Sequence, residues 1–257
     1  MGLLGSIESL APALAPILGA GLLTVGDWRL SFMVLAAVAG ALAIVLSATR
    51  QLPQVSRRPQ GSYAILLRDK RFLRYALSQA FVLGGLLTFV FGLPAVIVRV
   101  LGGTLTDFIV IQVAAIALFV AAANLAGRAV TRFGAERVIL FGTGLCTVGG
   151  AGQLLYALAG GTSLSVILAL FAPINIGLGL RGPPGFYRAV LASRGDDARG
   201  SALVILGILG ATTIGTILAS PFIERGTLAL SAVTFALESA VLFCLLVLPP
   251  LEEAGSR

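Results

Sequence analysis

The chain has 257 residues, of which 58% are hydrophobic and only 11% charged, with a formal net charge of +7 and a mean hydropathy of +1.01. Water-soluble domains carry about 25% charged residues, so this composition excludes an ordinary soluble protein. The sequence has no histidine, which excludes histidine-based catalysis and histidine metal sites. Cys146 and Cys244 stand far apart in apolar stretches. We therefore expect no enzyme activity, metal or cofactor.

Eight apolar stretches follow one another along the chain, each about 20 residues long. A helix of about this length crosses the hydrocarbon core of a bilayer, so the pattern predicts an all-α polytopic membrane protein with about eight transmembrane helices. We expect the prolines after Arg181 to end the sixth stretch and to leave Arg181 on the cytoplasmic face. The predicted spans are 3–25, 30–49, 75–98, 107–127, 138–160, 163–181, 201–222 and 227–249.

Positive charges gather on one side of these spans. The poorer side holds only Arg29, Arg99 and Arg225. Because Lys and Arg accumulate in cytoplasmic loops, we expect a multi-pass protein of the cell (inner) membrane with both termini in the cytoplasm. The loops account for the basic charge, so no nucleic-acid partner is expected. The richer side holds Arg50, Arg57, Arg58, Arg68, Lys70, Arg71, Arg74, Arg128, Arg132, Arg137, Arg181, Arg188, Arg194, Arg199 and Arg257.

The longest polar stretch, 50–74, divides the chain into two spans before it and six after it. It begins as a linker that contains proline and glycine, and it continues as a short amphipathic segment. In that segment cations would face anionic headgroups while apolar side chains lie on the bilayer interface. Those apolar side chains are Ile65, Leu66, Phe72 and Leu73.

Two acidic residues within the predicted spans are candidates for proton coupling. Glu238 lies near the middle of the last span, where an ionised carboxylate costs a few kcal/mol and the protonated form is favoured. The alternative for Glu238 is a structural role, as a paired or neutral buried acid. Glu8 lies near the cytoplasmic end of the first span, where its side chain can reach water.

Uncharged polar residues in the other spans are candidates for a substrate path. Amides and hydroxyls within a membrane also bond neighbouring helices to one another, which is the alternative role for each of them. The chain has 32 glycines, many close together or at small-xxx-small spacing, and we expect most of them to permit close helix packing. The path candidates are Gln79, Gln112, Asn124, Asn175, Thr212 and Thr213.

The first span carries a pattern of small residues around Pro16, followed by Asp27-Trp28-Arg29-Leu30-Ser31-Phe32. The pattern resembles the fifth-helix motif of drug:proton antiporters of the major facilitator superfamily, and the second stretch resembles the Gly-Trp-Arg-x-x-Phe that follows that helix. Small residues on one face would permit tight crossing against a helix of the opposite bundle, and Pro16 would bend the helix. The motif positions are Gly2, Ala11, Ala15, Pro16, Gly19 and Ala20.

The stretch Gly127 to Arg137 is similar to the superfamily's Gly-x-x-x-Asp-Arg-x-Gly-Arg-Arg/Lys cytoplasmic loop, with Thr131 at the place of the aspartate. The resemblance implies a tight turn at Gly134 and cations that hold the cytoplasmic side at two helix ends. Arg199-Gly200-Ser201-Ala202 resembles the start of the family's eleventh helix. The loop 63–75 looks like the central loop of the bicyclomycin/chloramphenicol-resistance type. The loop-motif residues are Gly127, Arg132, Gly134 and Arg137.

The resemblance covers helices five to twelve of that family. It implies that 1–49 form the last two helices of an N-terminal bundle, 50–74 a cytoplasmic linker with an amphipathic segment, and 75–257 a complete six-helix C-terminal bundle. The implied activity is efflux of small lipophilic molecules or drugs by proton antiport, with the lipid bilayer, a small-molecule substrate and protons as partners.

The first four helices of the family have no counterpart in the chain, so we expect a truncated form of such a transporter. The alternative is a non-transporting membrane fragment or subunit that acts through helix–helix association. Its partners would be the missing N-terminal helices or further copies of itself in a homo-oligomer.

Overall fold

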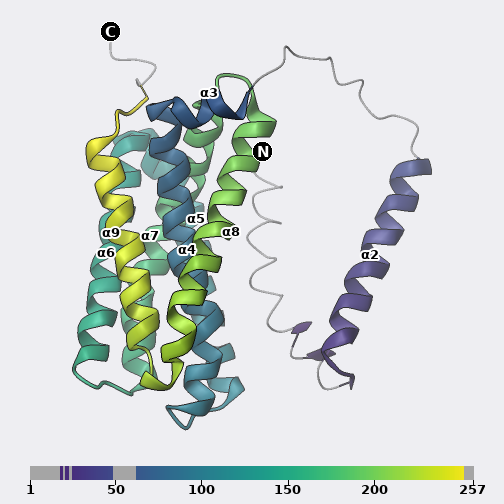
Figure 1. The fold of residues 1–257 in the computed structure, drawn as a ribbon, viewed down its shortest axis with the longest axis vertical. Helices are drawn as coiled ribbons and strands as arrows, with labels where there is room; N and C mark the ends of the chain where they lie inside the picture. The colour runs from purple at the N-terminus through teal and green to yellow at the C-terminus, as the bar shows by residue number, and fades with distance from the viewer. Residues whose placement is uncertain (1–17, 20, 23–24, 49–61, 252–257) are drawn as a thin grey trace. The chain divides into compact units, whose positions relative to one another are not determined.

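The computed structural model describes residues 18–19, 21–22, 25–48 and 62–251, and within these ranges it contains helices and turns but no strand (Figure 1). The helices are α2 (Trp28–Ala48), α3 (Tyr63–Arg68), α4 (Lys70–Arg99), α5 (Leu105–Phe133), α6 (Ala135–Leu158), α7 (Leu164–Leu191), α8 (Asp197–Ala219), the 3-10 helix η1 (Ser220–Arg225) and α9 (Leu228–Val247).

Seven helices among the described residues are long and apolar enough to cross a membrane: α2 and α4 to α9, with η1 continuing α8. This confirms an all-α polytopic membrane protein. The predicted span 3–25 lies almost wholly outside the described residues, as does the linker up to residue 61. The chain separates into two units, 1–60 and 61–257. In the first, the Trp28 ring packs edge-on against Phe32 near the start of α2.

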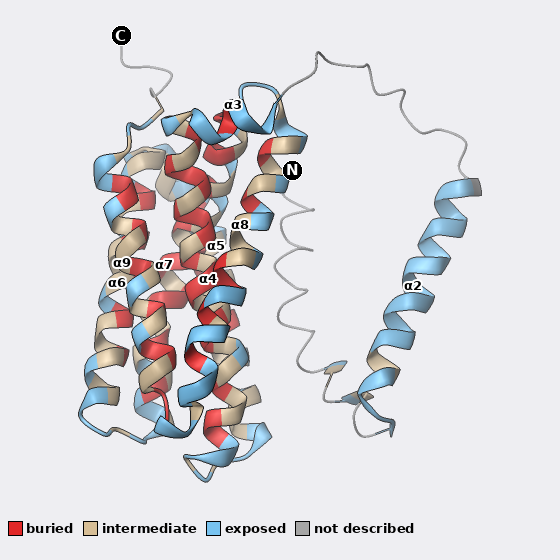
Figure 2. Cartoon of the chain, viewed as in Figure 1, coloured by how far each residue is buried: buried red, intermediate tan, exposed pale blue. Residues whose placement is uncertain are grey.

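The second unit is a bundle of six long helices arranged around α4 and α7. Helix α5 packs mainly on α7, and α8 packs correspondingly on α4. In the same way α6 packs on α7 while α9 packs on α4, and α6 and α9 also lie against each other. The two halves, α4–α6 and α7–α9, therefore exchange partners: the second and third helices of each half pack mainly on the first helix of the other half. Helices α4 and α7 accordingly carry the largest sets of buried residues (Figure 2).

Close helix contacts in this bundle depend on glycine. Gly142 on α6 and Gly177 on α7 cross face to face, and a Cβ on either would overlap the carbonyl oxygen of the other. Gly84 on α4 likewise leaves no room for a Cβ against Ala211 on α8. These positions have the expected packing role. Gly134 alone separates α5 from α6, with a φ of 84° that side-chain-bearing residues rarely adopt.

Helix α7 passes through Pro183 and Pro184 and ends only at Leu191. The expectation that these prolines end the sixth span at residue 181 is therefore wrong, and Arg181 lies inside the helix instead of on the cytoplasmic face. Proline is tolerated within transmembrane helices because neighbouring helices support the local backbone. Here α7 is packed against α4, α5 and α6.

The bundle begins with two capped helices. The Ser62 hydroxyl accepts a hydrogen bond from the Ala64 amide at the start of α3, and Asp69 accepts from Arg71 and Phe72 at the start of α4. Leu66 and Phe72 are buried in the core of the bundle, while Ile65 is exposed. The expectation that Leu66 and Phe72 lie on the bilayer interface is therefore wrong, because Leu66 on α3 and Phe72 in the first turn of α4 both pack into the bundle.

Candidate functional site

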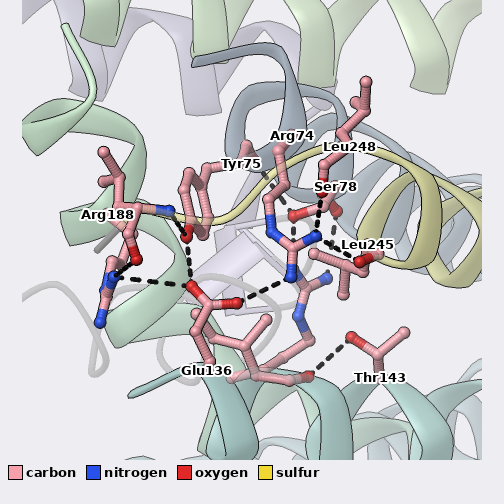
Figure 3. A network of polar contacts seen from close by, with 11 residues as sticks. Arg74, Tyr75, Ser78, Glu136, Thr143, Arg188, Leu245 and Leu248 are labelled. Atoms are coloured by element: carbon pink, nitrogen blue, oxygen red, sulfur yellow. Dashed lines mark hydrogen bonds and ion pairs between the residues drawn. The ribbon is translucent and has the colours of Figure 1, made fainter. Parts of the chain in front are cut away.

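Glu136, in the first turn of α6, is the centre of a polar network at the end of the bundle where α4 and α6 begin (Figure 3). Its Oε2 accepts a hydrogen bond from Arg74 Nη2 at 2.8 Å. Its Oε1 accepts from the Tyr75 hydroxyl and lies 3.6 Å from Arg188 Nη1. The N-terminal end of α6 also favours a negative charge at this position. One carboxylate thus joins α4, α6 and α7. We call this end of the bundle the arginine-rich end.

The same network holds the end of α9. Arg74 Nη1 donates to the carbonyl oxygens of Leu245 and Leu248 (Figure 3). The Leu251 amide donates to the Tyr75 hydroxyl at 2.9 Å, and Arg188 Nη1 donates to the Leu251 carbonyl at 3.2 Å. The last carbonyls of a helix lack partners within it, so a buried guanidinium satisfies them well. The network therefore connects four helices of the bundle.

The motif that resembles a cytoplasmic loop lies in α5 and α6 except for Gly134, and its residues stay outside this network. Gly127, Arg132 and Arg137 are exposed, and the Arg132 guanidinium lies 5.3 Å from the Phe133 ring centroid. Glu136 is the residue of this stretch that enters the network, and sequence reasoning did not single it out. The available signal was a single acid among the three arginines of the stretch Gly127 to Arg137.

A second polar cluster lies inside the bundle, around Glu238 on α9. The Glu238 side chain is fully buried, and neither carboxylate oxygen has a hydrogen-bond partner among the described residues. The carboxylate lies against Gly150 on α6, where a Cβ would overlap it. The absence of a side chain at Gly150 therefore makes the space that Glu238 occupies.

Arg181 on α7 is the cation of this cluster and is also fully buried. Its Nη1 donates to the Ser78 carbonyl at 3.1 Å and its Nη2 to the Ser78 hydroxyl at 2.9 Å. Arg181 interacts electrostatically with Glu238 and with Cys146 on α6. Within the described part of the chain, however, no hydrogen bond joins Arg181 to Glu238. An arginine and an acid are thus buried in one cluster without a hydrogen bond between them, and sequence reasoning had assigned Arg181 to the cytoplasmic face.

One substrate-path candidate reaches this cluster. Gln79 is buried next to Ser78, its amide nitrogen donates to the Gly182 carbonyl at 3.4 Å, and its amide oxygen has no partner among the described residues. A Cβ at Gly185 would lie 3.0 Å from that oxygen and 3.6 Å from Arg181 Nη2. Gln79 and Arg181 therefore border the same small space between α4 and α7.

The other path candidates differ in exposure. Asn175 and Thr212 are buried, Gln112 is half-buried, and Asn124 and Thr213 are exposed on the bundle. Four of these five, all except Gln112, donate to a carbonyl four residues earlier in their own helix: Asn124, Asn175, Thr212 and Thr213.

Most candidates from the first span lie outside the described residues: Glu8, Gly2, Ala11, Ala15, Pro16 and Ala20. Gly19 is described and half-exposed, with open space beside its Cα. Among the described residues there is no group of three or more His, Cys, Asp or Glu that could hold a metal ion.

Unpartnered polar groups continue from Glu238 toward the opposite end of the bundle. Gln153 on α6 and Ser231 on α9 are buried, border one small cavity, and have side-chain polar atoms without partners in the described structure. Gln153 follows Gly150 by one turn of α6. The contact between α6 and α9 therefore holds three buried side chains with unpartnered polar atoms: Glu238, Gln153 and Ser231.

Comparison with known families agrees with the helix pattern. Residues 1–220 match the family model described as Major Facilitator Superfamily. No curated protein matches the chain.

Proposed function

Since the chain belongs to the major facilitator superfamily, a family of membrane transporters, we propose that it serves in the efflux of small lipophilic molecules by proton antiport. The substrate class rests on the resemblance of the first span to the fifth-helix motif of drug:proton antiporters. In this proposal the protein lies in the cell (inner) membrane with both termini in the cytoplasm, as the distribution of arginines favours.

The observation that carries the proton coupling is Glu238, a fully buried carboxylate without a hydrogen-bond partner among the described residues. A carboxylate in such surroundings is more stable with its proton than without it. Arg181 is buried in the same cluster but donates its hydrogen bonds to Ser78. In this proposal a movement of α7 or α9 changes the separation of the guanidinium and the carboxyl group, and Glu238 takes up or releases its proton accordingly.

The Glu136 network supports the proposal in a different way. It joins α4, α6, α7 and the end of α9 to one another at the arginine-rich end of the bundle. Transport by rocking of bundles about a central site requires a rigid unit, which such contacts favour. Glu136 is thus proposed as a structural acid and Glu238 as the acid that changes its charge.

The test uses the full chain in liposomes with a pH-sensitive dye inside and ethidium as the lipophilic probe. We expect ethidium addition to release protons from acid-loaded vesicles with the unaltered chain, and Glu238→Gln to abolish this release. Glu224→Gln, at an exposed acid on η1, is the matched control and should retain it. Unchanged proton release in Glu238→Gln would show that Glu238 does not couple protons.

A separate arm tests whether the chain transports at all. If the unaltered chain releases no protons alone but does so when co-reconstituted with a four-helix N-terminal fragment of a drug:proton antiporter, then it acts as one part of a divided transporter. If neither arrangement shows flux, the efflux proposal is wrong and the membrane-fragment alternative is favoured.

A further inference from the structure

A pocket of about 390 Å³ lies at the arginine-rich end, where α5 ends and α6 begins. Small-molecule sites in proteins span about 300–1,000 Å³, so its size is within the range of ligand sites. Every lining residue except one is apolar. The lining residues are Ala129 and Phe133 on α5, Arg137, Val138 and Phe141 on α6, and Leu180 on α7.

Arg137 provides the charge of this pocket. It is exposed, and in the part of the chain that the structure describes no acid pairs with it. The neighbouring Glu136 does not neutralise it, because the Glu136 carboxylate is held by Arg74, Tyr75 and Arg188 inside the bundle (Figure 3). The pocket therefore combines an apolar wall with one free cationic group at its edge.

The surroundings select the kind of ligand. Helix ends of a membrane-spanning bundle lie near the level of the lipid headgroups, and Arg137 stands in the first turn of α6. The aromatic side chains Phe133 and Phe141 are exposed on the pocket wall, where they would meet acyl chains. An arginine guanidinium binds phosphate oxygens through paired hydrogen bonds.

We propose that this pocket binds one anionic phospholipid, with an acyl chain between Phe133 and Phe141 and the phosphate on Arg137. The inference concerns the outer wall of the bundle and holds whether or not the proposed efflux function is correct. A lipid bound here would contact the first turn of α6, the turn that carries Glu136, and would thereby brace the arginine-rich end from outside.

The experiment measures lipid preference at the pocket itself. The full chain carries one tryptophan, so Trp28→Phe combined with Phe141→Trp places a single reporter on the pocket wall. We would titrate dibrominated phosphatidylglycerol or dibrominated phosphatidylcholine into unbrominated phosphatidylcholine vesicles that contain this protein. We expect half-maximal quenching at a mole fraction about fivefold lower for phosphatidylglycerol, the factor that one arginine near an anionic headgroup supplies.

Two further substitutions test the two parts of the pocket. Arg137→Gln should remove the preference for phosphatidylglycerol, whereas Arg99→Gln, at an exposed arginine on the opposite end of α4, should preserve it. Ala129→Phe should fill the pocket and remove the preference while Arg137 stays in place. Equal mole fractions for the two lipids would mean ordinary annular lipid and would overturn the proposal, as would a preference that survives both Arg137→Gln and Ala129→Phe.

Discussion

Glu136 and Glu238 are acids of the same bundle, on the neighbouring helices α6 and α9, with opposite surroundings. Each Glu136 oxygen is engaged, by Arg74 on one side and by Tyr75 and Arg188 on the other. Neither Glu238 oxygen has a hydrogen-bond partner among the described residues. The comparison teaches that two acids of one bundle are distinguished by the partners around them. Glu136 is held by side chains of two other helices, whereas Glu238 is buried without a hydrogen-bond partner in the described structure.

The location of each acid explains the difference. Glu136 stands at the beginning of a helix, where the helix dipole and the arginines of the bundle end stabilise a negative charge. Glu238 stands in the middle of α9, opposite a glycine that provides space but no hydrogen-bonding side chain. The proximity of Arg181, itself bonded to Ser78, adds a field without a direct contact.

The largest expected effect is that of Glu136→Gln on stability. The substitution leaves Arg74 and Arg188 buried beside a neutral amide, and removing one member of a buried ionic group costs about 3–5 kcal/mol. Thermal unfolding of the purified protein in detergent would measure the loss. The matched control is Glu224→Gln, at an exposed acid, which should change stability little. A loss at Glu136 as small as that of the control would contradict the network.

Gly150→Ala should have an intermediate effect. The added methyl group overlaps the Glu238 carboxylate, and overpacking of this kind costs about 1–3 kcal/mol. Gly144→Ala on the same helix is the control, because a Cβ at Gly144 meets nothing within 4 Å. The control should be neutral or stabilising, since alanine favours helix more than glycine does. Equal behaviour of the two variants in thermal unfolding would show that Glu238 does not lie against Gly150.

The smallest stability effect is expected for Glu238→Gln. A neutral carboxyl group and an amide have similar shapes, and neither finds a hydrogen-bond partner at this position. The free energy of unfolding should therefore change by less than about 1 kcal/mol. The same chemical change at Glu136 and Glu238 would then give opposite results in one bundle. A loss at Glu238 as large as that at Glu136 would instead indicate an ionised carboxylate that depends on Arg181.

Much of the fold was predictable because bilayer thickness imposes length and hydropathy on every span. The predicted spans from 30–49 onward each correspond to a helix of the structure. The main error was the predicted end of α7. Pro183 and Pro184 each favour the end of a helix, but packing in the bundle outweighs this local preference. Local rules fail there because the support comes from helices distant in sequence.

The candidate site was predictable only in part. Glu238 is visible in the sequence because an acid within an apolar run is unusual. Glu136 is not, because a charge in a loop looks like a solvated one, and its partners Arg74 and Arg188 stand more than 50 residues away on either side. The lipid-facing and the bundle-facing sides of a transmembrane helix are both apolar, so the sequence does not tell on which side Asn124 or Thr213 lies. In the structure both are exposed on the bundle.

The exchange of partners between α4–α6 and α7–α9 has a consequence for biosynthesis. Helix α5 finds its main neighbour in α7, and α4 finds its own in α8 and α9. Because synthesis proceeds from the N-terminus, the first three helices of the bundle enter the bilayer before the surfaces that will cover them exist. Their packing faces therefore stay uncovered until the later helices have inserted in turn. Helix α4 is the last to be covered, since its main neighbours are α8 and α9, so the bundle is complete only when α9 has entered the bilayer.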